Sequence, residues 1–210
     1  MTHPGFCHIS QDSVSLMIDF SQGTPQILHW GQDLGNPKSS ADFVKAQLEP
    51  VAHAELDDPM FNGIWRENSR GNIGRPALLG HRSGSDFSQL FEIGSVTQSD
   101  KHIEVIAADV KAQLEITARF EFVGGGVLLV SQSLRNTGST DFTVEDLSAF
   151  MPLPDQIQES MDFTGRWVKE RQPQRREIQS GIFSRELREG RSSHDYTIMQ
   201  LAMTQGAGYQ

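Results

Sequence analysis

The segment Gln113–Phe122, "QLEITARFEF", carries the clearest pattern in the 210-residue sequence. The residues on its apolar face recur at every second position and are Leu114, Ile116, Ala118, Phe120 and Phe122. The intervening residues are charged or polar. Successive side chains of a strand point to opposite faces of a sheet, so this spacing predicts a strand with one buried and one solvated face.

Further strand candidates lie on both sides of this segment. They cover residues 13–20, 25–30, 86–96, 101–110, 127–136, 141–150, 181–186 and 196–203. Glycines at 124–126 and the sequence Asn136–Ser139 supply turns between neighbouring candidates. The best helix candidate is residues 39–49, with Ser40 as the expected N-cap. Consecutive strands joined by short turns predict an all-β, antiparallel sandwich with few short helices.

The composition fits a soluble globular chain with one core. Only 37% of the residues are apolar, and no apolar run approaches the length that spans a membrane. A lone Cys7 cannot form an internal disulfide, and the N-terminus lacks a basic region followed by an apolar segment. We therefore expect a cytoplasmic protein without membrane contact.

Basic residues concentrate near the C-terminal end, although the formal net charge of the chain is −9. Residues 166–191 hold eight Lys and Arg side chains, interleaved with Glu170, Glu177, Glu186 and Glu189. Binding to nucleic acid favours an unopposed basic stripe, whereas mixed signs favour pairing between arginines and carboxylates. We expect no nucleic-acid partner.

The sequence contains no strong catalytic motif. Its seven His residues are scattered, without ligand spacing, so we expect no metal and no cofactor. The adjacent Ser193, His194 and Asp195 have the residue types of an acyl-transfer triad but cannot easily face one another. Asp57, Asp58 and Glu67 are candidate acids for glycoside hydrolysis, yet exposed, solvated carboxylates are the default expectation. All three lie in a long loop, residues 50–84, of the kind that carries function or contacts a partner.

Asp162–Asp195 reads "DFTGRWVKERQPQRREIQSGIFSRELREGRSSHD", a dense pattern of fixed points. It resembles the N-terminal domain of the α-galactosidases of glycoside hydrolase family 36. Gln26–Gly35, "QILHWGQDLG", is similar to the first hairpin of that family, and Gly74–Arg82, "GRPALLGHR", to its loop facing the active site. The resemblance spans nearly the whole chain.

The resemblance implies a β-supersandwich of the galactose-mutarotase-like kind, placed before a catalytic (β/α)₈ barrel. The family hydrolyses terminal α-galactosides of melibiose and raffinose type with retention, using two Asp residues of the barrel. A barrel needs about 250 residues, so we expect residues 1–210 to be one truncated domain that lacks the barrel, has no catalytic residues and is inactive alone. The Arg-rich segment would then be a structural clasp, pairing with Glu170, Glu186 or backbone carbonyls above Trp167, with Arg171 as a member.

The resemblance also implies homo-oligomer contacts, with the loop reaching towards the active site of a neighbouring subunit. Many members carry Asp-Phe-Arg-Ser-Pro there. Alignment on Pro76 places Asn72, Ile73, Gly74 and Arg75 at these positions, so the acid and the aromatic residue are replaced. The expected substrate-binding residues are Asn72, Arg75 and Trp65, which would contact an α-galactoside through the parent enzyme. A loop with only a structural role is the alternative.

Two other functions remain open from the sequence. One is a free-standing carbohydrate-binding or interaction module. The other is a mutarotase-like epimerase on the same type of sandwich, with His81 or His102 as acid and Glu115 as base.

Overall fold

The computed structural model describes residues 4–48, 63–185 and 197–207. The chain divides into two compact units, Met1–Met151 and Pro152–Gln210, which are described separately. Strands dominate the described residues, and all pairings between them are antiparallel. The prediction of an all-β, antiparallel fold is confirmed. No helix among the described residues is long and apolar enough to cross a membrane.

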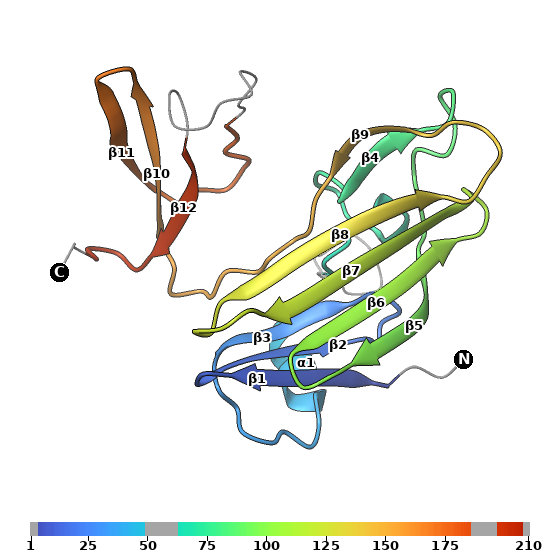
Figure 1. Cartoon of the computed structure of the whole chain (residues 1–210), viewed down its shortest axis with the longest axis horizontal. Coiled ribbons are helices and arrows are strands. Elements are labelled where there is room, and N and C mark those ends of the chain that lie inside the picture. The colour runs from blue at the N-terminus through green and yellow to red at the C-terminus, as the bar shows by residue number, and fades with distance from the viewer. Residues whose placement is uncertain (1–3, 49–62, 186–196, 208–210) are drawn as a thin grey trace, which may run out of the picture. The chain divides into compact units, whose positions relative to one another are not determined.

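The largest sheet of the first unit has four strands in the order β5-β6-β7-β8 (Figure 1). They are β5 (Glu92–Gln98), β6 (His102–Asp109), β7 (Leu114–Phe122) and β8 (Leu128–Asn136). The alternating segment forms β7, and its apolar residues are buried at every second position. β6 shows the same alternation, with Ile103, Val105 and Ala107 fully buried. One face of this sheet therefore forms a wall of the core.

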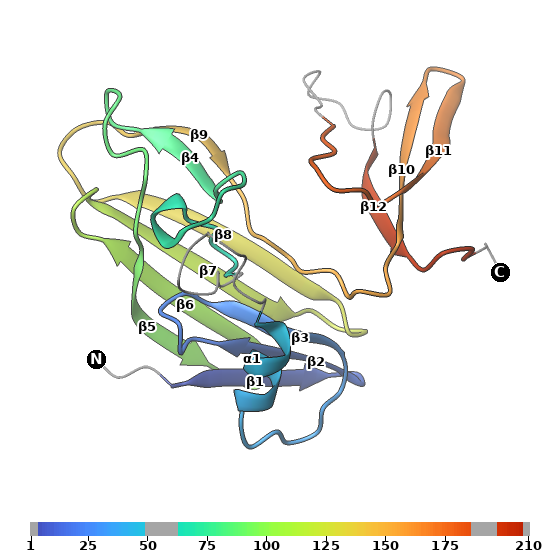
Figure 2. The same cartoon turned by 180° about the vertical axis from the view of Figure 1, so that it is seen from behind.

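A second sheet supplies the opposite wall. Its strands, in the order β1-β2-β3, are β1 (Phe6–Gln11), β2 (Val14–Asp19) and β3 (Gln26–Gln32). Leu16 and Ile18 of β2 belong to the same buried cluster as Phe120 of β7. In Figures 1 and 2 the three strands lie against the four-stranded sheet, so the two sheets form a sandwich around one core. β1 was not predicted from the sequence.

A short strand pair, β4 (Leu78–His81) with β9 (Thr143–Leu147), brings residues 60 to 70 positions apart into contact. Gly80 allows this close approach. A Cβ atom at Gly80 would lie 2.4 Å from the carbonyl oxygen of Thr143 and 2.6 Å from the ring of Phe142. Such distances are impossible without moving one strand, so this position requires glycine.

The only helix longer than one turn among the described residues is α1 (Ala41–Gln47). Its start agrees with the sequence, and Ser40 occupies the predicted N-cap position, but its side chain does not cap the helix. Ser40 makes no side-chain cap hydrogen bond, and its hydroxyl donates instead to Oδ2 of Asp19, at 2.7 Å. Asp19 is 1% exposed, and a buried carboxylate needs such donors. A tertiary contact therefore takes the hydroxyl that the local pattern assigns to the cap.

The second unit contains one sheet in the order β11-β10-β12. Its strands are β10 (Glu159–Arg166), β11 (Lys169–Glu177) and β12 (Thr197–Met203). Much of the Arg-rich segment thus forms β11, which the sequence did not predict. The strand predicted at residues 181–186 was wrong for its described part, since residues 181–185 are not in a strand.

Candidate functional site

The loop that precedes β4 is held in place by the buried carboxylate of Glu67. Its Oε1 accepts a hydrogen bond from the backbone N–H of Phe91, at 2.6 Å. Its Oε2 accepts one from Nε of Arg70, at 2.8 Å. The same guanidinium donates to the carbonyl oxygens of Gly23 and Phe91, at 3.1 and 2.8 Å. Glu67 and Arg70 therefore connect the loop to two other parts of the first unit. The expectation of an exposed, solvated Glu67 was wrong.

Burial is the main influence on the ionisation of Glu67. Loss of water around the carboxyl raises its pKa above the ordinary value of 4.5, and the negative charge of Asp109 acts in the same direction. The hydrogen bond from Phe91 and the positive charge of Arg70 oppose this change without cancelling it. Both carboxylate oxygens of Glu67 accept hydrogen bonds from groups of the protein itself, so this side chain has a structural role as the anchor of the loop.

Trp65 lies beside this anchor with its ring in the core, only 2% exposed. Its indole N–H donates to Oε1 of Gln132 on β8, at 2.7 Å, and its ring packs against that of Phe91 at a centroid distance of 6.1 Å. The first unit therefore offers no open face of this ring for stacking on a sugar. Any contribution of Trp65 to binding acts through the position of the loop.

The other two predicted binding residues lie at the tip of the loop. Gly71 adopts a left-handed conformation (φ 87°) that ends the short 3₁₀ helix η1 (Asn68–Arg70) and turns the chain outward. Asn72 follows, and its side-chain Nδ2 donates to the carbonyl oxygen of Gly74, at 3.0 Å. Arg75 is exposed and pairs with Asp146 of β9, at 3.1 Å. The tip thus presents an amide and a guanidinium on one turn.

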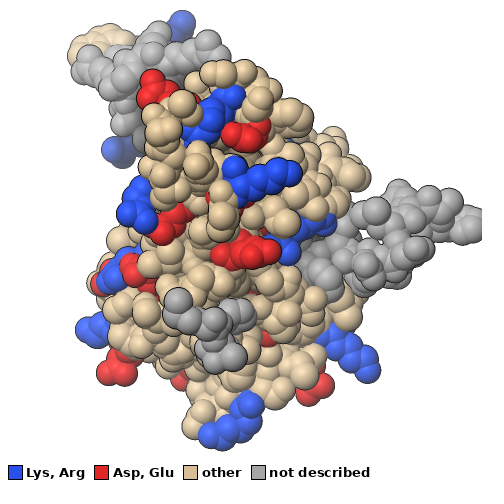
Figure 3. Space-filling model, turned by 90° about the vertical axis from the view of Figure 1, so that its right-hand side faces the viewer, with Lys and Arg blue, Asp and Glu red and all other residues tan. Residues whose placement is uncertain are grey.

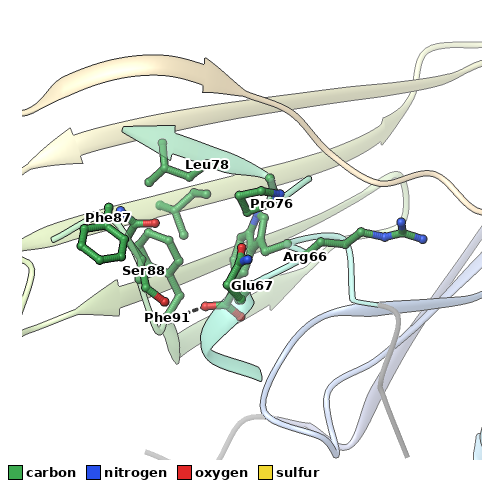
Figure 4. A pocket seen from close by; sticks show the side chains of 12 residues that line it. Arg66, Glu67, Pro76, Leu78, Phe87, Ser88 and Phe91 are labelled. Carbon is green, nitrogen blue, oxygen red and sulfur yellow. Dashed lines mark hydrogen bonds between the residues drawn. The ribbon is translucent and has the colours of Figure 1, made fainter. Parts of the chain in front are cut away.

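Two adjoining cavities lie between this loop and the segment that follows β4. The inner one, drawn in Figure 4, is lined by Trp65, Glu67 and Phe91 among others and has a volume of about 10 Å³. This is close to the least that one water molecule needs. The outer one has about 380 Å³ and is lined by Asn68, Pro76, Leu79, Gly80, His81, Phe87, Ser88 and Glu145. Asn68, Pro76, Phe87 and Ser88 border both cavities.

The residues considered for a mutarotase-like site do not converge as required. His102 lies opposite Glu121 in the register of β6 and β7, whereas Glu115 lies opposite Ala108. Six residues along a strand correspond to about 20 Å, too far for His102 and Glu115 to act on one hydroxyl. Glu115 instead pairs with Arg135, at 2.9 Å. The structure gives His81 a different acidic neighbour, Glu145, which the sequence did not indicate.

The other candidate residues give no second site within the described structure. Asp57 and Asp58, and the group Ser193, His194 and Asp195, lie outside the described residues. Among the residues that are described, no group of three or more His, Cys, Asp or Glu side chains is arranged to hold a metal ion.

The Arg-rich segment makes ion pairs of the kind expected of a structural clasp, with Asp162 and Glu159 as acids, and one of the predicted contacts to a backbone carbonyl. The predicted partner Glu186 lies outside the described residues. Asp162, 2% exposed, is bound by Arg176, at 2.7 Å, and by Arg185. Arg176 also lies over the ring of Phe183, at 3.8 Å from its centroid. Arg175 pairs with Glu159 and donates to the carbonyl oxygen of Ala207, at 2.7 Å.

Two details of the predicted clasp differ in the structure. Trp167 is 72% exposed, so most of its side chain is not covered as predicted. Arg171 is exposed, has a left-handed backbone (φ 56°) and makes no ion pair with the described residues.

On the face shown in Figure 3, Lys and Arg side chains are interspersed with Asp and Glu and form no continuous basic stripe.

The antiparallel sheets and the outward-turned loop define a β-sandwich domain, and comparison with known proteins gives its family. Residues 23–210 match the glycosyl hydrolase family 36 N-terminal domain, so the chain belongs to this family. The α-galactosidase of Escherichia coli is 28% identical over 205 residues, which are 98% of this chain and 28% of that protein. The chain therefore spans little more than a quarter of the length of this relative.

Solved structures show the same fold. The α-galactosidase AgaA of Geobacillus stearothermophilus, as a variant crystallised with raffinose, superposes with a TM-score of 0.81 at 16% identity, over 96% of this chain and 32% of that chain. The α-galactosidase of Lactobacillus brevis gives a TM-score of 0.80 at 14% identity, over 96% of this chain and 31% of that one. A further AgaA variant was crystallised with stachyose.

Proposed function

We propose that this chain is the non-catalytic N-terminal part of a retaining α-galactosidase that hydrolyses terminal α-galactosides of the melibiose and raffinose type. The family match over residues 23–210 carries this proposal. The raffinose and stachyose complexes of solved relatives support the substrate class. The use of Glu67 as an internal anchor supports a structural role, because retaining hydrolysis needs two available carboxyl groups about 5 Å apart.

Within that enzyme the domain supports the catalytic barrel and the assembly of a homo-oligomer. The tip of the loop contributes to substrate binding, with Asn72 and Arg75 as the contacting residues and Trp65 as their buried support. The exposure of Arg75 and the outward turn at Gly71 favour this role. Neither residue supplies the chemistry of bond cleavage.

Comparison of the 210-residue chain with the protein encoded by the complete reading frame tests the proposal. With a chromogenic α-galactoside, the chain alone should give no turnover, whereas the complete protein should release galactose with retention, as seen by NMR of the first anomer formed. Turnover by the purified chain would overturn the non-catalytic assignment. Absence of α-galactosidase activity in the complete protein would overturn the proposed substrate class.

The contribution of the loop is tested in the complete protein with Asn72→Ala. A hydrogen bond between neutral groups contributes about 0.5–1.5 kcal/mol, so kcat/KM should fall several-fold with thermal stability unchanged. Ile73→Ala is the matched control at the neighbouring position, since Ile73 is 87% exposed. Equal kinetics for the Asn72 variant and the wild type would limit the loop to a structural role.

A further inference from the structure

The outer cavity has the size and the mixed lining of a small-ligand site. Its volume of about 380 Å³ lies in the range of about 300–1,000 Å³ that is usual for such sites. We propose that it binds one neutral hexopyranose unit of an oligosaccharide, as a non-catalytic site of this domain. Phe87 and Pro76 would contact the apolar face of the sugar, and His81 with Glu145 would bind its hydroxyl groups.

Phe87 provides the apolar side of the proposed site. Its side chain is 71% exposed although it borders a cavity, and an exposed aromatic ring at such a position is a common feature of binding surfaces. The segment that carries it is closed by an internal hydrogen bond and attached to the end of β6 by another. Nε2 of Gln89 donates to the carbonyl oxygen of Asp86, at 2.5 Å, and the N–H of Leu90 donates to Oδ2 of Asp109, at 2.8 Å. The ring is therefore presented on an ordered segment, which lowers the entropic cost of binding.

His81 and Glu145 provide the polar side. Nδ1 of His81 accepts a hydrogen bond from the backbone N–H of Gly84, at 3.1 Å, so the neutral ring carries its proton on Nε2. Nε2 lies 3.9 Å from Oε1 of Glu145, beyond hydrogen-bonding distance. A hydroxyl oxygen can lie about 2.8 Å from both atoms. This hydroxyl would accept a hydrogen bond from Nε2–H of His81 and donate one to Oε1 of Glu145. Such a donor and acceptor pair suits an alcohol.

The charge of the lining favours a neutral ligand. Glu145 would repel a phosphate or a carboxylate, and the neighbouring cation, Arg82, is already engaged. Its guanidinium lies 3.3 Å from Asp86 and donates to the carbonyl oxygen of Ala112 and to Oδ1 of Asn136, each at 3.0 Å. Asn68 and Ser88 add further neutral hydrogen-bonding groups. Such a lining suits a polyhydroxylated ring better than an anion.

The ligand class follows from the cavity itself, and only the choice of raffinose as the first probe rests on the proposed function. Titration of the 210-residue chain with raffinose, galactose and glucose, followed by amide NMR, should show saturable shifts at Phe87, Ser88 and His81. The dissociation constant should be on the order of 1 mM, a weak affinity expected for one sugar unit. Glucuronate, a hexose with a carboxylate, should bind at least several-fold more weakly than glucose.

Two exposed residues allow variants that spare the fold. Phe87→Ala and Glu145→Gln should each weaken sugar binding at least five-fold. Glu145 is suitable because its side chain is 61% exposed. Val110→Ala, at a side chain 87% exposed outside the cavity, and Glu92→Gln, at an exposed carboxylate of β5, are the matched controls and should bind as the wild type does.

The absence of saturable binding for all three neutral sugars would overturn the proposal, as would equal binding by the wild type and both cavity variants. Tighter binding of glucuronate than of glucose would contradict the argument from charge. A change in oligomeric state of Phe87→Ala, with sugar binding retained, would identify a protein contact instead. These readouts do not require hydrolysis, so loss of the proposed function and loss of this site are distinguished.

Discussion

Replacement of Glu67 tests whether a buried ionic anchor or ordinary apolar packing holds the loop in place. Glu67→Ala removes the acceptors of two hydrogen bonds, from the N–H of Phe91 and from Nε of Arg70. Glu67→Gln keeps an oxygen that can still accept from Phe91 but removes the charge. The two variants therefore separate the hydrogen bonds from the ion pair.

The contacts of Glu67 determine the expected change in unfolding free energy for each variant. In Glu67→Ala, a buried N–H without an acceptor costs about 2 kcal/mol. The side chain of Arg70 is 27% exposed and keeps two carbonyl acceptors, so its loss is smaller, about 1 kcal/mol. Unfolding free energy should fall by about 3 kcal/mol in total. In Glu67→Gln the lost ion pair and the relieved burial of charge oppose each other, so the change should stay within about 1 kcal/mol.

The pH dependence follows from the raised pKa of Glu67. Because the folded state holds this proton more tightly than the unfolded state, the group contributes stability at pH values below its ordinary value of 4.5. That contribution is lost as the pH rises through the higher pKa of the folded state. The stability of the wild type minus that of Glu67→Gln should therefore decrease as the pH increases across this interval.

Hydrogen exchange at the Phe91 amide, together with urea unfolding, measures the effect locally and globally. Protection of that amide should fall strongly in Glu67→Ala and be retained in Glu67→Gln. Glu115→Ala is the matched control, since its partner Arg135 has a side chain 68% exposed and such a pair contributes about 0–1 kcal/mol. Unchanged protection and stability in Glu67→Ala would refute the anchor. A rising difference with pH would refute the sign of the pKa change.

Three further predictions concern other parts of the chain. Asp162→Ala should destabilise the second unit by about 3 kcal/mol because Arg176 and Arg185 lose their carboxylate partner. Arg171→Ala should change the stability of this unit by less than about 0.5 kcal/mol. Hydrogen exchange in β10 tests this difference, and equal effects would contradict it. Gly80→Ala should weaken sugar binding and expose amides of β4 to exchange, since its Cβ would meet the carbonyl of Thr143 at 2.4 Å. Burial raises the pKa of Cys7 to about 11, so the folded chain at pH 8 should react with a thiol reagent far more slowly than the urea-unfolded chain, and similar rates would contradict this.

The sequence signal was clearest for strands that are buried on one face only, although β1, which shows part of the same alternation, was missed. β6 and β7 alternate strictly between buried and half-exposed residues, and both were identified. β11 has no such signal, since its residues are exposed or half-exposed throughout and many are Arg, Gln or Glu. It exists through pairing with β10, a contact that local patterns do not encode. Conversely, Ile182 and Phe183 suggested a strand, yet both are exposed.

The site was less predictable because its contacts join distant parts of the chain. The spacing of Glu67 and Arg70 is compatible with an ion pair, but the decisive partner of Glu67 is the amide of Phe91, 24 positions away. His81 and Glu145 meet only because β4 pairs with β9. Arg75 is exposed, whereas the burial of Trp65 reflects a packing requirement that its sequence context does not show.

The anchor lies next to two neighbouring surfaces, the exposed tip and the outer cavity. The backbone carbonyl of Glu67 accepts from the N–H of Arg70, at 3.1 Å, and from that of Asn72, at 3.2 Å, so it defines the turn that ends in the exposed tip. The intervening Asn68 borders the outer cavity. A substitution that displaces Glu67 should therefore disturb both the tip and the cavity, whereas Phe87→Ala should disturb the cavity alone. Loss of both properties in Glu67→Ala and of one in Phe87→Ala would identify the Glu67–Arg70 pair as the element that positions them.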